Sequence, residues 1–344
     1  MSQQINRQVV LASRPNGKPQ ANNFTIAEAP IPTPEDGQVL SKTIYLSLDP
    51  YMRGRMNAGK SYADPVEIDE VMSGGTVGQV IESKNSGFSA GDFVFGYGGW
   101  QEFWLQDGKK LKKVDPQLAP ISTATGVLGM PGVTAYTGLL NIGQPKKGET
   151  VVVAAASGAV GSVVGQIARI KGTRVVGIAG TPEKCEFVTE ELGFDACVNH
   201  SLQDFAENLK SACPNGIDVY FENVGGKVFE KVLPLLNNFS RIPVCGVISS
   251  YNATQLPAGP NLTPLLMRYI LVKRLTFRGF IVWDFDSQEE EALTQLSNWI
   301  KEGKIRYRED IVDGLENAPE AFMGLLEGKN FGKLVVRVSD EPAG

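Results

Sequence analysis

At 344 residues the chain is long enough for about two domains, and its 42% hydrophobic and 21% charged residues are typical of a soluble globular protein. The net charge of −5, with no run of like charges, argues against a nucleic-acid-binding face and a polybasic membrane anchor. With no apolar membrane span or signal peptide, and with four widely spaced cysteines that form no C-x-x-C pair, we expect a cytoplasmic protein with reduced thiols.

Up to about residue 125 the chain consists of short β-rich segments separated by turn residues. These segments cover residues 7–13, 37–50, 74–83 and 91–106. Closely spaced short strands of this kind predict an irregular antiparallel barrel or sandwich.

From about residue 126 the pattern changes to strands that alternate with helices. Strands are expected at residues 149–156, 174–180, 196–200, 216–225 and 241–249, and helices at Gly161–Lys171, from about Thr181, at Phe205–Ser211 and at Val228–Leu236. This alternation predicts an α/β fold with a doubly wound parallel sheet. Residues 251–269, rich in proline, glycine and apolar residues, are expected to form a loop, either a movable pocket wall or a plain surface crossing.

After a helix expected at Glu289–Glu302, short β-rich segments return and end with residues 330–338. The chain is therefore expected to leave its first domain, build the α/β domain and come back. This organisation assigns residues 1–125 and 306–344 to a β-rich domain and residues 126–305 to the α/β domain.

The turn that follows the first strand of the α/β domain, AAASGAVGSVVG, raises the question of a bound nucleotide. As a dinucleotide-binding pattern it reads Ala155-x-x-Gly158-x-x-Gly161, with alanine in place of the first glycine. Alone, this pattern suits a tight turn in any α/β protein equally well. The apolar strand before it and the amphipathic helix after it favour a Rossmann domain that binds a pyrophosphate. The expected cofactor-binding residues in this turn are Ala155, Ser157, Gly158, Ala159, Val160 and Gly161.

The end of the second strand indicates NADP(H) rather than NAD(H). An NAD-binding chain would place Asp or Glu there against the ribose 2′-hydroxyl, but this strand ends in Gly180 and Thr181. Lys184 follows one helical turn later, where its ammonium could meet a 2′-phosphate while Thr181 donates a hydroxyl hydrogen bond. The alternative is that Lys184 is an ordinary solvated helix lysine.

Seven motifs, spread in order over nearly the whole chain, resemble those of the zinc-independent medium-chain dehydrogenases/reductases. They are Leu46–Met56, Gly129–Leu139, Ala155–Ser162, Ala179–Cys185, Tyr220–Gly226, Gly246–Asn252 and Asn330–Val338. Within this superfamily the chain resembles the leukotriene B4 dehydrogenase, prostaglandin reductase and alkenal double-bond reductase group, which includes bacterial NADPH-dependent curcumin reductases. The resemblance implies a GroES-like catalytic domain and a Rossmann domain, a homodimer, and NADPH-dependent reduction of the C=C bond of enones, enals and curcumin-like compounds.

No zinc is expected, because a catalytic zinc site needs three protein ligands, usually Cys, His or acidic residues. The chain has one histidine, His200. Zinc-bearing relatives carry a cysteine near Ser47 and a Gly-His-Glu sequence near residues 72–74, and neither is present here. The resemblance instead assigns His200 to the cofactor, since relatives have a 2′-phosphate-binding tyrosine at this point.

The resemblance also suggests how a substrate carbonyl is polarised without a metal. Hydride transfer to the β-carbon develops negative charge on the carbonyl oxygen, which a hydrogen-bond donor stabilises by a few kcal/mol. Tyr251 matches a family tyrosine that faces this carbonyl, although its position alone would favour an ordinary loop tyrosine. Tyr51, Met52 and Tyr62 are expected to bind the substrate, with a core role as the alternative for the two tyrosines.

Asn223, Ser249 and Asn330 complete the cofactor contacts that the resemblance implies. The alternatives are a turn-forming role for Asn223 and a loop role for Asn330. Two other functions stay open, namely an NADPH quinone oxidoreductase and a non-catalytic NADPH-binding regulatory or structural protein. The identity of the small-molecule substrate is not readable from the sequence.

Overall fold

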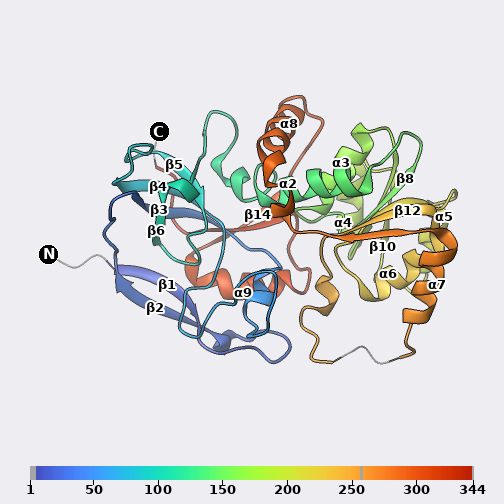
Figure 1. Ribbon diagram of the computed structural model, residues 1–344, viewed down its shortest axis with the longest axis horizontal. Coiled ribbons are helices and arrows are strands. Elements are labelled where there is room, and N and C mark those ends of the chain that lie inside the picture. Colours follow the sequence, from blue (N-terminus) through green and yellow to red (C-terminus); the bar gives the residue numbers. More distant parts are fainter. Residues whose placement is uncertain (1–4, 256–258, 343–344) are drawn as a thin grey trace. The chain divides into compact units, whose positions relative to one another are not determined.

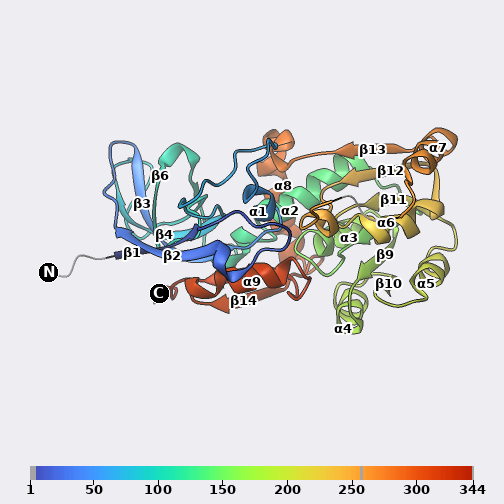
Figure 2. The same cartoon turned by 90° about the horizontal axis from the view of Figure 1, so that it is seen from below.

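The structure, a computed structural model, describes residues 5–255 and 259–342, and the chain divides into two compact units. Unit 1 comprises Met1–Gly126 and Glu309–Gly344, and unit 2 comprises Val127–Arg308. Figure 1 and Figure 2 show the elements of each unit from two sides. Unit 1 is therefore made from both ends of the chain, and unit 2 from a single continuous segment.

Unit 2 contains a six-stranded sheet in the order β10-β9-β8-β11-β12-β13, in which every pairing is parallel. The strands are β8 (Thr150–Ala154), β9 (Arg174–Ala179), β10 (Ala196–Asn199), β11 (Ile217–Phe221), β12 (Leu236–Val244) and β13 (Thr276–Gly279). The chain runs outward from β8 to β10 and then returns to the other side of β8 as β11. This reversal is a topological switch point, where parallel α/β sheets bind ligands at the carboxyl ends of their strands.

Helices cover both faces of this sheet, which confirms the doubly wound α/β fold (Figure 1). On one side lie α2 (Met130–Thr137), α3 (Gly161–Ile170) and α8 (Glu289–Lys301), and on the other α5 (Phe205–Ala212), α6 (Gly226–Val232) and α7 (Thr263–Lys273). Strands β8, β9 and β11 are almost wholly buried, as their runs of valine and isoleucine require. The short helix α4 (Pro182–Glu186) begins with the expected proline in its first turn.

Two expectations about unit 2 are wrong in detail. The helix expected to reach Leu236 ends at Val232, because Pro234 breaks it and Leu236 is already the first residue of β12. The segment 251–269 is not a loop throughout, since α7 begins at Thr263 with Pro264 in its first turn, where proline is tolerated. Residues 256–258 of that segment lie outside the described residues.

Unit 1 is β-rich, with a seven-stranded sheet and a separate two-stranded sheet. Its strands are β1 (Ile5–Leu11), β2 (Phe24–Pro30), β3 (Gln38–Ser47), β4 (Thr76–Ser83), β5 (Phe93–Gly96), β6 (Phe103–Asp107), β7 (Lys112–Lys113), β14 (Glu309–Asp313) and β15 (Lys333–Arg337). The pairings are antiparallel, except that β14 and β15 run parallel. Strands β2 and β13 and the helix α9 (Ala318–Leu325) were not predicted from the sequence.

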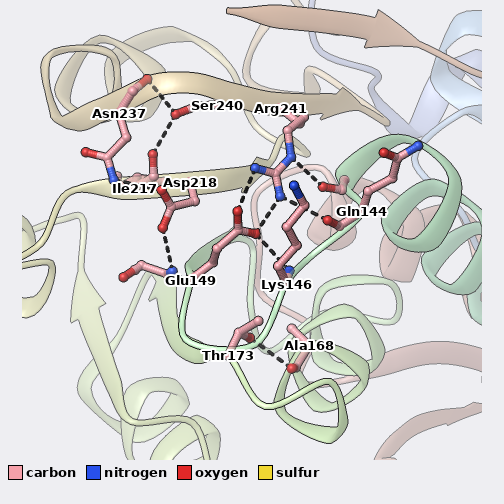
Figure 3. Close-up of polar contacts among 12 residues, drawn as sticks. Gln144, Lys146, Glu149, Ala168, Thr173, Ile217, Asp218, Asn237, Ser240 and Arg241 are labelled. Carbon is pink, nitrogen blue, oxygen red and sulfur yellow. Dashed lines mark hydrogen bonds and ion pairs between the residues drawn. The ribbon is translucent and has the colours of Figure 1, made fainter.

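A polar clamp fixes the amino-terminal edge of the unit 2 sheet, opposite the switch point. Arg241 of β12 donates to both carboxylate oxygens of Glu149, at 3.0 and 2.5 Å, and to the carbonyl oxygens of Gly143 and Gln144 at 2.9 and 3.0 Å. Figure 3 shows the guanidinium between this carboxylate and the loop before β8. Burial would raise the pKa of Glu149, but hydrogen bonds from Arg241 and from the Lys146 backbone outweigh it and lower that pKa.

Replacing Arg241 with methionine should lower the free energy of unfolding by roughly 2–3 kcal/mol, the contribution of hydrogen bonds to a charged group. The folded-state pKa of Glu149 lies below its unfolded value, so its carboxylate stabilises the fold above the unfolded pKa. That contribution is lost as the pH falls through the folded pKa. Urea denaturation at several acidic pH values should therefore show a smaller acid-dependent loss of stability in the variant than in the parent.

The matched control is Arg337→Met, which removes a solvent-exposed ion pair with Asp313. This control should leave the urea midpoint almost unchanged. Equal effects of the two substitutions would show that the clamp is no more important than a surface ion pair.

Candidate nucleotide and substrate sites

The turn after β8 places special demands on the backbone at two positions. Ala155 adopts a left-handed conformation with φ of 52°, and its carbonyl oxygen accepts a hydrogen bond from the Gly158 N–H at 3.0 Å. A Cβ added at Gly161 would lie 2.3 Å from that same carbonyl oxygen, so no larger residue fits there. The pattern around residues 155–161 therefore forms the tight strand-to-helix turn that a dinucleotide site requires.

Helix α3 follows this turn directly, and no side chain caps its amino-terminal end. Within its first turn, the N–H of Ser162 donates to the carbonyl oxygen of Gly158 at 3.0 Å, and those of Val163 and Val164 donate to that of Val160 at 3.1 and 3.0 Å. A pyrophosphate at this helix end would therefore accept hydrogen bonds from the backbone of the preceding turn, at residues 159–161. Ser157 is buried, and Gly158, Ala159 and Val160 are partly exposed. These residues fit a dinucleotide phosphate.

Four of the residues predicted to bind the 2′-phosphate come together at the end of β9. A Cβ added at Gly180 would lie 3.3 Å from Nε2 of His200, so the glycine leaves room for the imidazole. The hydroxyl of Thr181 accepts a hydrogen bond from the backbone N–H of Lys184 at 3.3 Å and caps α4. Burial lowers the pKa of His200, and the positive charge of Lys184 lowers it further. The cluster thus holds one cation and one neutral imidazole.

Thr181 also donates its hydroxyl hydrogen to Glu183, which contributes to the lowered pKa of that carboxyl. The expected donation from Thr181 to a phosphate would require this hydroxyl to leave Glu183. Ser201, which the sequence analysis passed over, lies in the same cluster and donates its hydroxyl to the carbonyl oxygen of Gly180 at 2.9 Å.

Glu222 organises the turn after β11. Its buried carboxylate accepts hydrogen bonds from the backbone N–H groups of Val224 at 2.7 Å and Gly225 at 2.8 Å. The hydroxyl of Tyr220 donates to the same oxygen at 3.1 Å. Burial raises the pKa of Glu222, and these hydrogen bonds oppose the shift. Glu222 was not predicted as a site residue, although an acidic residue directly before a glycine-rich turn indicates such a role.

The turn after β11 is tied to the turn after β12. Four backbone hydrogen bonds of 3.0–3.2 Å join residues 222–224 to residues 245–249. Asn223 extends the connection to β8, since its Nδ2 donates to the carbonyl oxygen of Ala154 at 2.8 Å. The carboxyl ends of three neighbouring strands therefore form one hydrogen-bonded unit.

Tyr251 lies in this unit, immediately after a single 3₁₀ turn (Ile248–Ser250). Its phenolic oxygen accepts a hydrogen bond from the backbone N–H of Val247 at 3.4 Å, and its own N–H donates to the carbonyl oxygen of Ile248 at 3.2 Å. Ser249 is exposed, and its hydroxyl lies 3.0 Å from where a Cβ at Gly226 would be. Asn223, Ser249 and Tyr251 thus meet at one edge of the sheet.

In unit 1, Tyr51 and Tyr62 share a cationic neighbour. The guanidinium carbon of Arg55 lies 5.8 Å from the ring centroid of Tyr51 and 5.5 Å from that of Tyr62. Tyr62 is 52% exposed, whereas burial raises the pKa of Tyr51 well above its ordinary value. Arg55 was not predicted as a site residue. Its guanidinium brings a positive charge close to both aromatic rings.

Met52 does not belong to this group. It is fully buried in the apolar core of unit 1, together with Leu46 and Trp100, so the expectation that it contacts substrate is wrong. The prediction failed because an apolar residue next to a candidate site in the sequence can line a pocket or belong to the core, and the sequence does not distinguish the two. Asn330 donates its amide to the carbonyl oxygen of Gly332 at 2.8 Å and so stabilises its own loop.

Comparison with known proteins decides the family. Two family models match the chain, one described as the N-terminal domain of oxidoreductases over residues 7–114 and one as zinc-binding dehydrogenase over residues 159–299. NADPH-dependent curcumin reductase of Escherichia coli (strain K12) is 57% identical over 339 residues, which is 98% of each chain. The chain belongs to the medium-chain dehydrogenase/reductase family.

Other members agree with this assignment. Prostaglandin reductase 1 of Bos taurus is 42% identical over 326 residues, which is 93% of this chain and 95% of that protein. The crystal structure of CurA from Vibrio vulnificus in complex with NADPH matches with a TM-score of 0.94 and 56% identity, over 97% of this chain and 100% of that one. The family resemblance and the two-part fold expected from the sequence are confirmed.

The name of the second family model raises the question of zinc, and the donor groups do not fit it. Within residues 5–255 and 259–342, no three His, Cys, Asp or Glu side chains gather as a metal site would require. Ser47 donates its hydroxyl to Asp49, and Asp49 pairs with the buried ammonium of Lys333 at 2.8 Å. A serine committed to this ion pair stands where zinc-bearing relatives carry a ligand, so we derive no step through a metal.

Proposed function

We propose that this protein reduces the C=C bond of α,β-unsaturated ketones and aldehydes with NADPH. The observation that carries the proposal is the hydrogen-bonded unit at residues 222–251, which places a phenol beside a dinucleotide-type turn, in a chain 57% identical to an NADPH-dependent curcumin reductase. Aromatic substrates of this class also suit the two rings around Arg55 in unit 1.

Bound NADPH would supply a hydride to the β-carbon of the substrate. The turn of residues 155–161 before α3 would bind the pyrophosphate through its backbone N–H groups, and the cluster at Gly180, Lys184 and His200 would bind the 2′-phosphate. Tyr251 would donate a hydrogen bond to the substrate carbonyl oxygen, where negative charge develops as the enolate forms. The Val247 N–H that donates to the phenolic oxygen polarises the hydroxyl and strengthens it as a donor.

The remaining residue assignments are part of this proposal. Tyr51 and Tyr62 bind the substrate, and Asn223, Ser249 and Asn330 contact the cofactor. For Asn223 this role adds to the structural one, because a primary amide can accept on its oxygen while its nitrogen donates to Ala154.

The decisive test measures NADPH oxidation with a panel of enones, enals and quinones, and identifies the products by mass spectrometry. We expect the saturated ketone or aldehyde. Turnover confined to quinones would instead support a quinone oxidoreductase. Tight NADPH binding without turnover of any acceptor would support the non-catalytic role.

Lys184→Ala should raise the KM for NADPH by roughly tenfold or more, the effect of losing one charge-assisted hydrogen bond, and leave the KM for NADH nearly unchanged. The reason is that only NADPH carries the 2′-phosphate. Lys171→Ala, which removes an exposed lysine at the far end of α3, is the matched control and should affect neither cofactor. Equal losses for both cofactors in Lys184→Ala would contradict the assignment.

Activity should survive exhaustive chelation, because the donor set around Ser47 does not suit zinc. Elemental analysis of the purified protein, paired with assays before and after chelator treatment, checks this. Stoichiometric zinc that leaves together with the activity would refute it.

A homodimer is the proposed assembly. Strand β13 is an edge strand of the unit 2 sheet, and α7 exposes apolar side chains, with Met267, Leu271 and Val272 being 58%, 77% and 57% exposed. An exposed edge beside apolar surface favours association of two copies. Light scattering at several concentrations measures the mass, and a concentration-independent monomer would contradict the proposal.

A cytoplasmic location is proposed on the state of the cysteines. All four are thiols, which is typical of a reducing compartment. Within the described part of the chain, no helix has the length and apolar character needed to cross a membrane. Fractionation of the source cells tests the location directly.

A further inference from the structure

Cys185 and Cys197 form a pair of thiols at the base of α4. Cys185 lies in α4 and Cys197 in β10, elements that pack against each other, and the two side chains are in hydrogen-bonding contact. Both are partly exposed. Cys197 pairs across the sheet with Gly177 of β9, where a Cβ would lie 3.2 Å from its sulfur. The glycine therefore leaves room for this sulfur, which a side chain at position 177 would crowd.

The two thiols are chemically unequal. The hydrogen bond from Cys197 lowers the pKa of Cys185 despite burial, and a backbone hydrogen bond from Ala179 lowers it further. The same contact and burial raise the pKa of Cys197. Burial raises the pKa of Cys213 to about 11 and that of Cys245 to about 12. Among the four cysteines, Cys185 is the one suited to react as a thiolate.

We propose that Cys185 and Cys197 are an oxidation site, at which a peroxide converts the two thiols into a disulfide. The sulfur of Cys185 attacks the peroxide, so an S–O bond forms, the O–O bond breaks and the first oxygen leaves as water. The sulfur of Cys197 then attacks that of Cys185, the S–S bond forms, and the second oxygen leaves as water with the thiol proton. Two thiols and one hydrogen peroxide give one disulfide and two waters.

The pair adjoins the proposed 2′-phosphate cluster, so this consequence rests on the proposed function. Lys184 directly precedes Cys185, and Thr181 accepts hydrogen bonds at the start of the same helix. A disulfide bond is about 2.05 Å long, shorter than any hydrogen-bonding contact between sulfurs, so closing it draws α4 toward β10. Oxidation should therefore displace Lys184 and weaken NADPH more than NADH.

The sequence allows a direct chemical test. Trypsin cleaves after Lys184 and Lys210 and leaves both cysteines in one peptide, residues 185–210, while Cys213 and Cys245 fall in other peptides. After treatment with hydrogen peroxide and alkylation, this peptide should lose two hydrogen atoms and take up no alkyl group, and dithiothreitol should reverse the change. The peptides with Cys213 and Cys245 should alkylate fully and serve as internal controls.

Single substitutions distinguish the thiol that attacks the peroxide, Cys185, from the thiol that then forms the disulfide, Cys197. Cys197→Ser should leave Cys185 as a sulfenic acid that dimedone traps, and Cys185→Ser should leave Cys197 unmodified at the same peroxide dose. Cys213→Ser, the matched control, should form the disulfide normally. Oxidation of Cys213 or Cys245 before the pair, or a Cys185 sulfinic acid without a disulfide, would overturn the proposal.

Binding of NADPH and NADH to the reduced and oxidised protein, measured by calorimetry, tests the consequence. We expect the Kd for NADPH to rise roughly tenfold on oxidation, as when one charge-assisted hydrogen bond is lost, and that for NADH to change little. Unchanged NADPH binding by a protein shown to hold the disulfide would overturn the link to Lys184. Absence of NADPH binding in both states would contradict the proposed function and leave the peptide result standing.

Discussion

Tyr251→Phe should lower kcat/KM for an enone by roughly tenfold to a thousandfold, the range for loss of one oxyanion donor. The substitution keeps the ring and removes the hydroxyl. It also removes the acceptor of the Val247 N–H, a long contact of 3.4 Å, whereas the backbone hydrogen bond from residue 251 to Ile248 does not involve the hydroxyl and should hold the turn. Binding of NADPH, measured by calorimetry, should hardly change. The effect therefore belongs to the chemical step, where charge develops on the substrate oxygen.

Tyr269→Phe is the matched control, because Tyr269 lies on α7 with its ring under the ammonium of Lys273, at 4.9 Å from the centroid. It should keep parental kinetics. The product of the residual activity in Tyr251→Phe should still be the saturated ketone. An unimpaired Tyr251→Phe enzyme would remove the residue from the mechanism, and an allylic alcohol as product would overturn the reaction class.

Glu222→Ala should affect both stability and catalysis. The backbone N–H groups of Gly225, which is buried, and Val224, which is partly buried, would lose their acceptor, at a cost of roughly 1–3 kcal/mol each. The turn that carries Asn223 and supports residues 245–249 would then shift. Misplacement by about 1 Å can cost on the order of a hundredfold in rate, so we expect a loss of that order in kcat/KM.

Glu222→Gln provides the control, since its amide oxygen can still accept both backbone hydrogen bonds and Tyr220 can rotate its hydroxyl. This variant should keep most of the activity and of the urea midpoint. If both variants lose activity to the same extent, the negative charge matters rather than the support of the turn. If neither has an effect, the turn does not depend on Glu222.

Much of unit 2 could be predicted from the sequence because its signals are local. Runs such as Val151–Val153 identify buried parallel strands, and Gly161 is explained by a contact with Ala155, six residues away. A cluster at the end of β9 could be predicted for a related reason; its members are Gly180, Thr181, Lys184 and His200. Parallel neighbours β9 and β10 end at the same edge, which brings the residues after each strand together.

What could not be predicted depends on tertiary packing. Met52 and Tyr51 are adjacent in the sequence, yet one is in the core and the other lies beside Arg55, and no local pattern distinguishes them. The role of Glu222 requires the backbone of residues 224–225 to fold back on it. The thiol contact of Cys185 with Cys197 joins a helix to a strand through a register that only the folded sheet defines.

The placement of β15 between β14 and β3 has a consequence for synthesis in the cell. Lys333, at the start of β15, donates from its buried ammonium to the carbonyl oxygen of Leu48 and to Asp49, both at 2.8 Å. At ordinary translation rates the ribosome needs on the order of tens of seconds to make the residues between these partners. Unit 2 is continuous and can fold as it emerges. In β3, by contrast, β6 can pair with Gln38–Lys42, but residues 45–47 wait for β15 and Asp49 waits for its cation. The nascent first part of unit 1 is therefore the region of this chain that most needs a chaperone.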